Sequence, residues 1–183
     1  MSRVGRKPIE LPDKVSGAVS GQSLRIKGPK GELTIQLPDG LSAKAEAKTI
    51  VVARASEDRL VRSEHGLFRN LIANMVTGVQ TGFQRDLEIS GVGYKAEVDG
   101  RTLVLSLGFA RPVRFEIPQG IDVDVDKGTR LAVKGIDKHK VGLVAAQIRG
   151  LRPPDPYKAK GIKYVDEVVR RKAGKAGATA AAS

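Results

Sequence analysis

The residues best suited to chemistry in this sequence lie in a basic, proline-rich stretch near its C-terminus. Residues 152–175 contain eight Lys or Arg against three Asp or Glu, a balance of +5. Three prolines within residues 153–156 stiffen the backbone, because each proline ring fixes its own φ angle. An extended cationic chain with few apolar side chains can follow a line of phosphates. The side chains that we expect to contact a polyanion are Lys158, Lys160, Lys163, Arg170, Arg171, Lys172, Arg152 and Tyr157.

A second basic cluster lies where a helix is predicted to begin. Lys138 and Lys140 flank a histidine there, and cations at a helix N-terminus oppose the helix dipole. An anion bound at this end would satisfy both the lysines and the free backbone N–H groups. A solvated basic turn fits the same residues, so we keep both interpretations open.

Three other patterns match known sites only in part. Residues 91–96 fit the start of a dinucleotide fingerprint, but a hairpin and not a helix is predicted next, which favours a turn. Residues 122–126 alternate Asp and Val like a calcium loop, yet Lys127 and Val133 replace the required Gly and Glu, which favours a half-buried strand. Residues 28–31 lack the Lys-Ser/Thr ending of a phosphate loop and predict a hairpin turn.

No constellation typical of an enzyme is visible. The two histidines, His65 and His139, have no acid, base or nucleophile at a spacing that predicts catalysis, and the chain contains no cysteine. We therefore expect a non-enzymatic protein without a cofactor or a bound metal.

The charge of the whole chain points to a polyanionic partner. The 183 residues carry a formal net charge of +12, and such proteins gain affinity for nucleic acid by releasing counterions. An anionic membrane surface would attract the same charge, so charge alone does not name the partner. The sequence contains neither a secretory signal nor a membrane-spanning stretch, which predicts a cytoplasmic protein.

The chain repeats itself loosely at a period of about 72 to 80 residues, which predicts duplication of one fold. Each half has short strands with tight glycine turns and ends in an amphipathic helix. The matching segments are 19–26 with 98–105, 37–41 with 117–121, 50–52 with 131–133, and 71–78 with 143–150.

These elements predict an α+β fold of two tandem duplicated domains, each a mainly antiparallel sheet with one packed helix. We assign residues 1–81 and 82–152 to the two repeats. Residues 153–175 form an extended basic segment, and 176–183 a disordered Ala-rich tail. Ser56 is predicted to cap the first helix. Its apolar stripe is Leu67, Phe68, Leu71, Ile72, Met75, Val76 and Val79.

Residues 154–162 resemble the signature of the bacterial ribosomal protein L-six family of the large subunit. Residues 1–9, 74–79 and 87–96 agree with the same family, and the resemblance extends from Met1 to about Lys175. The Ala-rich tail beyond Lys175 is the main departure from the family pattern.

The resemblance implies a duplicated α+β protein that binds large-subunit (23S-type) ribosomal RNA, mainly through its C-terminal half. It also implies a place in the ribosome near the stalk base and the factor-binding region, beside neighbouring ribosomal proteins. Two alternatives remain: a nucleoid-type DNA-binding protein, and an enzyme acting on a nucleotide. The first lacks an evident helix-turn-helix, and the second lacks a catalytic set.

Overall fold

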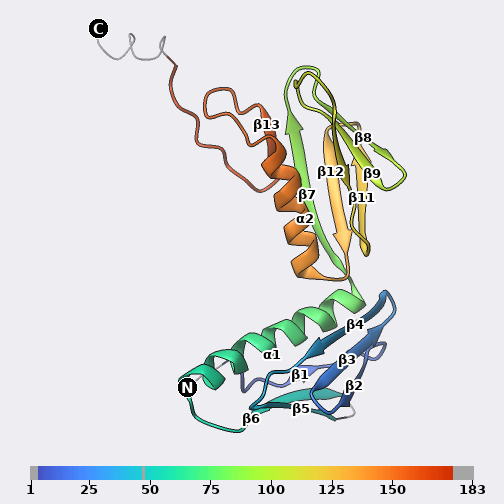
Figure 1. The fold of residues 1–183 in the computed structure, drawn as a ribbon, viewed down its shortest axis with the longest axis vertical. Helices are drawn as coiled ribbons and strands as arrows, with labels where there is room; N and C mark the ends of the chain where they lie inside the picture. The colour runs from blue at the N-terminus through green and yellow to red at the C-terminus, as the bar shows by residue number, and fades with distance from the viewer. Residues whose placement is uncertain (1–3, 47, 175–183) are drawn as a thin grey trace. The chain divides into compact units, whose positions relative to one another are not determined.

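The computed structural model describes residues 4–46 and 48–174, which form an α+β fold with mainly antiparallel sheets (Figure 1). Contacts between Cα atoms divide these residues into two compact units. One runs up to Phe83 and takes in Ile136–Lys138; the other comprises Gln84–Gly135 and the chain from His139 onward. The predicted Ala-rich tail at 176–183 lies outside the described residues.

The first unit has two three-stranded sheets and one helix, α1 (Arg59–Gln80). One sheet has the order β2-β3-β4 and the other the order β1-β6-β5. Alternating side chains from both sheets pack with α1 in one core that includes Leu24, Ile26 and Ile50. The strands are β1 (Ile9–Glu10), β2 (Ser16–Ser20), β3 (Ser23–Gly28), β4 (Gly31–Gln36), β5 (Leu41–Glu46) and β6 (Thr49–Arg54).

Two expectations about α1 are wrong in detail. Leu67 is 54% exposed, because at 100° per residue it lies about 140° around the helix from the buried Ile72. Ser56 does not cap the helix. Asp58 holds the N-cap position, and the Ser56 hydroxyl donates instead to the Asp58 carboxylate over 2.8 Å. Ile72, Val76 and Val79 of the predicted stripe are buried as expected.

The second unit has a three-stranded sheet, a four-stranded sheet and one helix, α2 (Lys138–Leu151). The sheet orders are β10-β9-β8 and β11-β12-β7-β13. Figure 1 shows α2 lying along β7 and β12, and the helix buries Val141, Val144, Ala145 and Ile148. The strands are β7 (Phe83–Ser90), β8 (Lys95–Asp99), β9 (Thr102–Ser106), β10 (Val113–Glu116), β11 (Ile121–Asp126), β12 (Arg130–Gly135) and β13 (Gly161–Tyr164).

The predicted duplication is confirmed by the order of elements and by matching hydrogen bonds. Each unit has a meander of three strands, then a hairpin, then a helix; only β13 has no counterpart. Corresponding turns close with corresponding backbone bonds. These are Leu37 N to Gln22 O and Ile117 N to Arg101 O, both 2.8 Å, and Leu41 N to Pro38 O (3.2 Å) and Ile121 N to Pro118 O (3.4 Å).

The three partial motifs are structural, as predicted. The Tyr94 amide donates to the Gly91 carbonyl over 3.3 Å, which forms a turn that leads into strand β8 and not into a helix. The Asp-Val alternation at 122–126 falls within strand β11. Gly28 pairs with Gly31 at the tip of the β3–β4 hairpin.

Candidate nucleic-acid interface

Residues 152–161, the proline loop, form a closed loop between α2 and β13. The Ile162 amide donates to the Arg152 carbonyl over 2.8 Å and closes its base. Across the loop, the Asp155 amide donates to the Lys160 carbonyl, and the Ala159 amide donates to the Asp155 carbonyl, both over 2.9 Å. These three bonds tie the two arms together, so the loop has a defined shape.

The Asp155 side chain holds the tip of the proline loop. Its Oδ2 accepts hydrogen bonds from the amides of Tyr157 (3.1 Å) and Lys158 (2.8 Å), as in an Asx turn. Asp155 is an acid within the predicted basic segment, residues 153–175. The Asp155 carboxylate shapes the backbone that carries Lys158.

Two residues on the second arm have left-handed backbone conformations. Ala159 has φ of 56°, and its side chain is buried. Gly161 has φ of 144°, and a Cβ atom there would lie 2.6 Å from the Pro153 carbonyl oxygen. The close approach of the two arms therefore requires glycine at position 161.

The proline loop presents two lysines beside a surface cavity. Lys158 and Lys160 are exposed, whereas Ile162 after them is completely buried and anchors the strand. A cavity of about 380 Å³ is lined by Tyr94, Arg152, Pro153, Asp155, Lys158 and Lys160. Cationic groups around a concave surface with one aromatic ring suit a phosphate-bearing ligand.

Sequence reasoning missed Tyr94 as a member of this site. The turn at Gly91–Tyr94 follows β7, and β7 pairs with β13 so that Ser90 lies opposite Gly161. This pairing brings the turn to the base of the proline loop. Tyr94 could have been assigned to this site from the sequence only by predicting that β13 pairs with β7, and no local pattern indicates that pairing.

Arg152 is half-buried and held in place. Its guanidinium carbon lies 4.8 Å from the centroid of the Phe109 ring, which is a cation–π contact. Phe109 itself is 45% exposed. This contact fixes the direction of the Arg152 side chain at the edge of the cavity.

Lys163 differs from the other predicted contacts because its side chain forms an ion pair. It lies opposite Glu88 in the β13–β7 ladder, and its Nζ is 3.2 Å from the Glu88 Oε2. The lysine side chain is only 27% exposed. Part of its charge is therefore compensated within the protein.

Arg170, Arg171 and Lys172, which we call the basic strip, are exposed and lead back to the proline loop. The Lys172 amide donates to the Pro156 carbonyl over 2.8 Å. Residues 153–174 are thus not one extended run: they comprise a closed loop, a paired strand and a returning segment. The return places a second group of cations beside the first.

An ion pair fixes the start of this returning segment to α2. The Arg149 guanidinium donates to both oxygens of Glu167, over 2.8 and 2.5 Å, and the Tyr164 amide donates to the same carboxylate over 3.2 Å. The hydrogen bond from Arg149 lowers the pKa of Glu167 below its ordinary value, and the hydrogen bond to Glu167 raises the pKa of Arg149. Arg149 therefore acts as a positioning residue for the segment.

Lys138 and Lys140 do not join the other cations. Lys138 is the first residue of α2, and the proline loop follows the last, so a helix of about 20 Å lies between them. The Lys138 Nζ lies 5.8 Å from the centroid of the Phe83 ring. Both lysines are exposed at a helix N-terminus. A separate phosphate contact at this helix end therefore remains a prediction.

Residues 4–46 and 48–174 contain no group of three or more His, Cys, Asp or Glu side chains arranged to hold a metal ion. In the same part of the chain, neither helix has the length and apolar character needed to cross a membrane.

The sequence profile described as Ribosomal protein L6 matches residues 11–82 and 90–165. This chain belongs to that family of structural ribosomal proteins. The two matched segments correspond to the two duplicated units, and the second includes the proline loop and β13. The basic strip lies beyond the match.

Bacterial relatives match almost the whole chain. The large ribosomal subunit protein uL6 of Crocosphaera subtropica is 52% identical over 177 residues, which cover 97% of this chain and 99% of the relative. The protein of the same name from Synechococcus elongatus is 54% identical over the same shares. That from Syntrophomonas wolfei is 52% identical, again over 97% and 99%.

Proposed function

We propose that this protein binds 23S-type ribosomal RNA as a structural constituent of the large ribosomal subunit in the bacterial cytoplasm. The observation that carries the proposal is the proline loop, which holds Lys158 and Lys160 at one rim of a cavity with Arg152 and Tyr94. The hydrogen bond from Lys172 to Pro156 adds the basic strip to the same surface.

Binding through this surface would combine charge neutralisation with a fit to RNA shape. Each lysine or arginine that reaches a phosphate releases condensed counterions, which favours binding at low salt. Folded RNA is recognised largely through its shape, phosphates and 2′-hydroxyls, and a rigid cationic protrusion suits such a target. The hydrogen bonds that close the loop fix it before binding, so less conformational entropy is lost on contact.

We further propose that the bound protein stabilises RNA tertiary structure near the stalk base and the factor-binding region. Membership of the ribosomal protein family supports this location. The first unit, with its own core and without a counterpart of the proline loop, would face neighbouring ribosomal proteins at the stalk base or solvent. The chemistry would be purely non-covalent, with no catalytic step.

A competition experiment distinguishes this proposal from a nucleoid-type DNA-binding protein. Purified full-length protein bound to labelled 23S-type RNA is challenged with unlabelled folded RNA or with duplex DNA of equal phosphate concentration. We expect folded RNA to displace the label at far lower concentration than DNA. Equal displacement by the two competitors would contradict the proposal and favour the DNA-binding alternative.

A further inference from the structure

The outward face of the four-stranded sheet in the second unit is acidic, although the chain carries a net charge of +12. Side chains on β11 alternate, with Ile121 and Val123 buried and the aspartates between them exposed. On the neighbouring strands, Leu87 and Leu131 are likewise buried. The charged outward residues of the four strands are Asp86, Glu88, Asp122, Asp124, Asp126, Arg130, Lys134 and Lys163, five acids against three bases.

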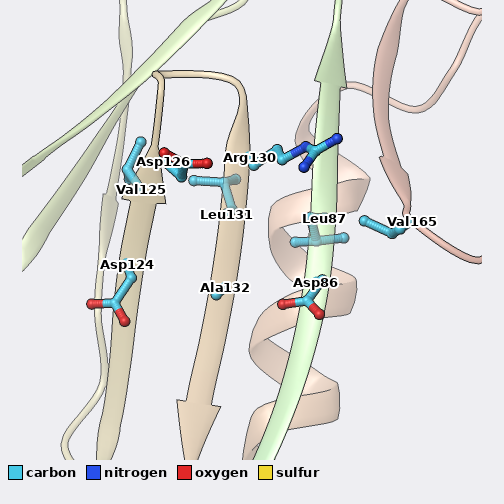
Figure 2. A pocket seen from close by; sticks show the side chains of 9 residues that line it. All are labelled: Asp86, Leu87, Asp124, Val125, Asp126, Arg130, Leu131, Ala132 and Val165. Carbon is cyan, nitrogen blue, oxygen red and sulfur yellow. The ribbon is translucent and has the colours of Figure 1, made fainter.

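A pit lies in the middle of this acidic face. A cavity of about 350 Å³ has Asp124 of β11 and Asp86 of β7 on its rim, with Ala132 of the intervening strand β12 between them (Figure 2). Ala132 lies directly opposite Asp124 in the β11–β12 register. Its methyl group leaves room that a longer side chain would fill. Val165, which is 57% exposed, adds apolar surface beside Asp86.

The excess of acids disfavours an RNA backbone on this face. The cavity lining has three aspartates, Asp86, Asp124 and Asp126, against one cation, Arg130, and phosphates are repelled by carboxylates. Lys134 donates to Asp124 over 2.6 Å and compensates one of them. The face still has more acids than bases, so its charge is complementary to a cationic partner and opposite to that of the proline loop.

We infer that this face docks a lysine- or arginine-rich polypeptide segment of a partner protein. The hydrocarbon stem of one basic side chain would lie on Ala132 and Val165, because such stems cover apolar surface well. Its charged head would pair with the carboxylate of Asp86 and would compete with Lys134 for that of Asp124. The inference is independent of RNA binding, because it concerns other residues of the second unit.

The test uses the full-length protein labelled with ¹³C at its alanine methyl groups and a synthetic eight-residue peptide of alternating Lys and Thr. We expect the peptide to shift the Ala132 methyl signal and to leave that of the buried Ala96 unchanged. Asp86→Asn with Asp124→Asn should weaken binding about tenfold, since two exposed ion pairs are lost. The charge-matched control, Asp99→Asn with Glu116→Gln, should bind like the unaltered protein.

A second variant tests the contribution of the pit's shape separately from that of its charges. Ala132→Leu fills the pit without changing any charge, and we expect weaker peptide binding with an unchanged dependence on salt. Equal affinity of the Asp86/Asp124 variant and its control would overturn the inference. So would an Ala132 shift caused by a uridine oligonucleotide, which would assign the face to nucleic acid. A shift that depends on protein concentration alone would assign it to a second copy of this chain.

Discussion

At the residue scale, the predicted cations differ in how much of their charge faces outward. Lys158 and Lys160 are exposed on a loop whose backbone is fixed by hydrogen bonds, whereas Lys163 is paired with Glu88 over 3.2 Å. A lysine already engaged by a carboxylate must break that pair to meet a phosphate. The two loop lysines are therefore expected to contribute more to RNA binding than Lys163.

Lys158→Ala and Lys160→Ala should each weaken RNA binding and lower the slope of log affinity against log salt by about one. Filter binding to 23S-type RNA at several salt concentrations measures both quantities. Lys44 is an exposed lysine of the first unit, and Lys44→Ala serves as the control. It should change the affinity and the salt slope less than either loop variant does. A double loop variant with the affinity and slope of the unaltered protein would remove the proline loop from the interface.

Asp155→Ala should weaken RNA binding although it removes a negative charge. The carboxylate holds the amides of Tyr157 and Lys158, and losing such a cap costs about 1 kcal/mol of local stability. Asp155→Asn keeps an acceptor oxygen and should retain most of the affinity. Tighter binding by Asp155→Ala would mean that simple charge, and not the shape of the loop, determines recognition.

Residue types alone predict the cations but not their environment. The basic composition of residues 152–175 is plain in the sequence. The pairing of Lys163 depends on Glu88, which lies 75 residues earlier (163 minus 88), and the role of Tyr94 depends on the same strand pairing. Contacts over such separations arise from the assembled sheet, and no local pattern encodes them.

At the scale of elements, the segment after β13 is fixed by the Arg149–Glu167 pair, which should make its stability depend on pH. The folded protein lowers the pKa of Glu167 from its ordinary value of 4.5, so the pair stabilises above that value and is lost as the pH falls through the lower, folded one. Glu167→Gln should therefore reduce the free energy of unfolding by about 1 kcal/mol near pH 7.

Urea unfolding at several pH values measures this effect. The difference between Glu167→Gln and the unaltered protein should shrink as the pH falls below 4.5, because Glu167 of the unfolded protein takes up a proton first and Glu167 of the folded protein only at lower pH. Glu97→Gln, which removes an exposed pair with Lys95, is the control and should cost less. A difference that stays constant from pH 7 to pH 3 would contradict the assigned role of the ion pair.

Two glycine substitutions should have opposite effects on stability. A Cβ atom at Gly161 would meet the carbonyl oxygens of Pro153 and Arg152 at 2.6 and 2.7 Å, so Gly161→Ala should destabilise by roughly 2 kcal/mol or more. A Cβ atom at Gly142, in α2, would meet nothing within 4 Å, and Gly142→Ala should stabilise by about 0.5–1 kcal/mol. Thermal unfolding compares the two, and a tolerated Gly161→Ala would mean that the arms of the loop can separate.

Periodicity predicted the elements better than their ends. The duplicated strands and both helices follow from repeating apolar patterns, and the structure confirms them. The predicted capping residue of α1 was wrong because Ser56 and Asp58 compete for the N-cap position, and the choice between them depends on the whole turn. Strand β13 has no counterpart in the first unit, so the internal repeat gave no indication of it.

At the scale of the whole molecule, the second unit carries two surfaces of opposite charge. The proline loop and the basic strip are cationic, and the outward face of the β11-β12-β7-β13 sheet is acidic. A net charge of +12 predicted a polyanionic partner, but this single sum does not show that the second unit has a cationic and an acidic surface. Such a division suits a protein that binds RNA on one side and a basic polypeptide on another.

The most direct test of the central claim is sedimentation of a cell lysate through a sucrose gradient, with each fraction probed for this protein at moderate and then high salt. The protein should migrate with large ribosomal subunits and remain with them after a high-salt wash, as an integral component would. A protein that stays at the top of the gradient, or that migrates with DNA, would contradict its assignment to the large subunit.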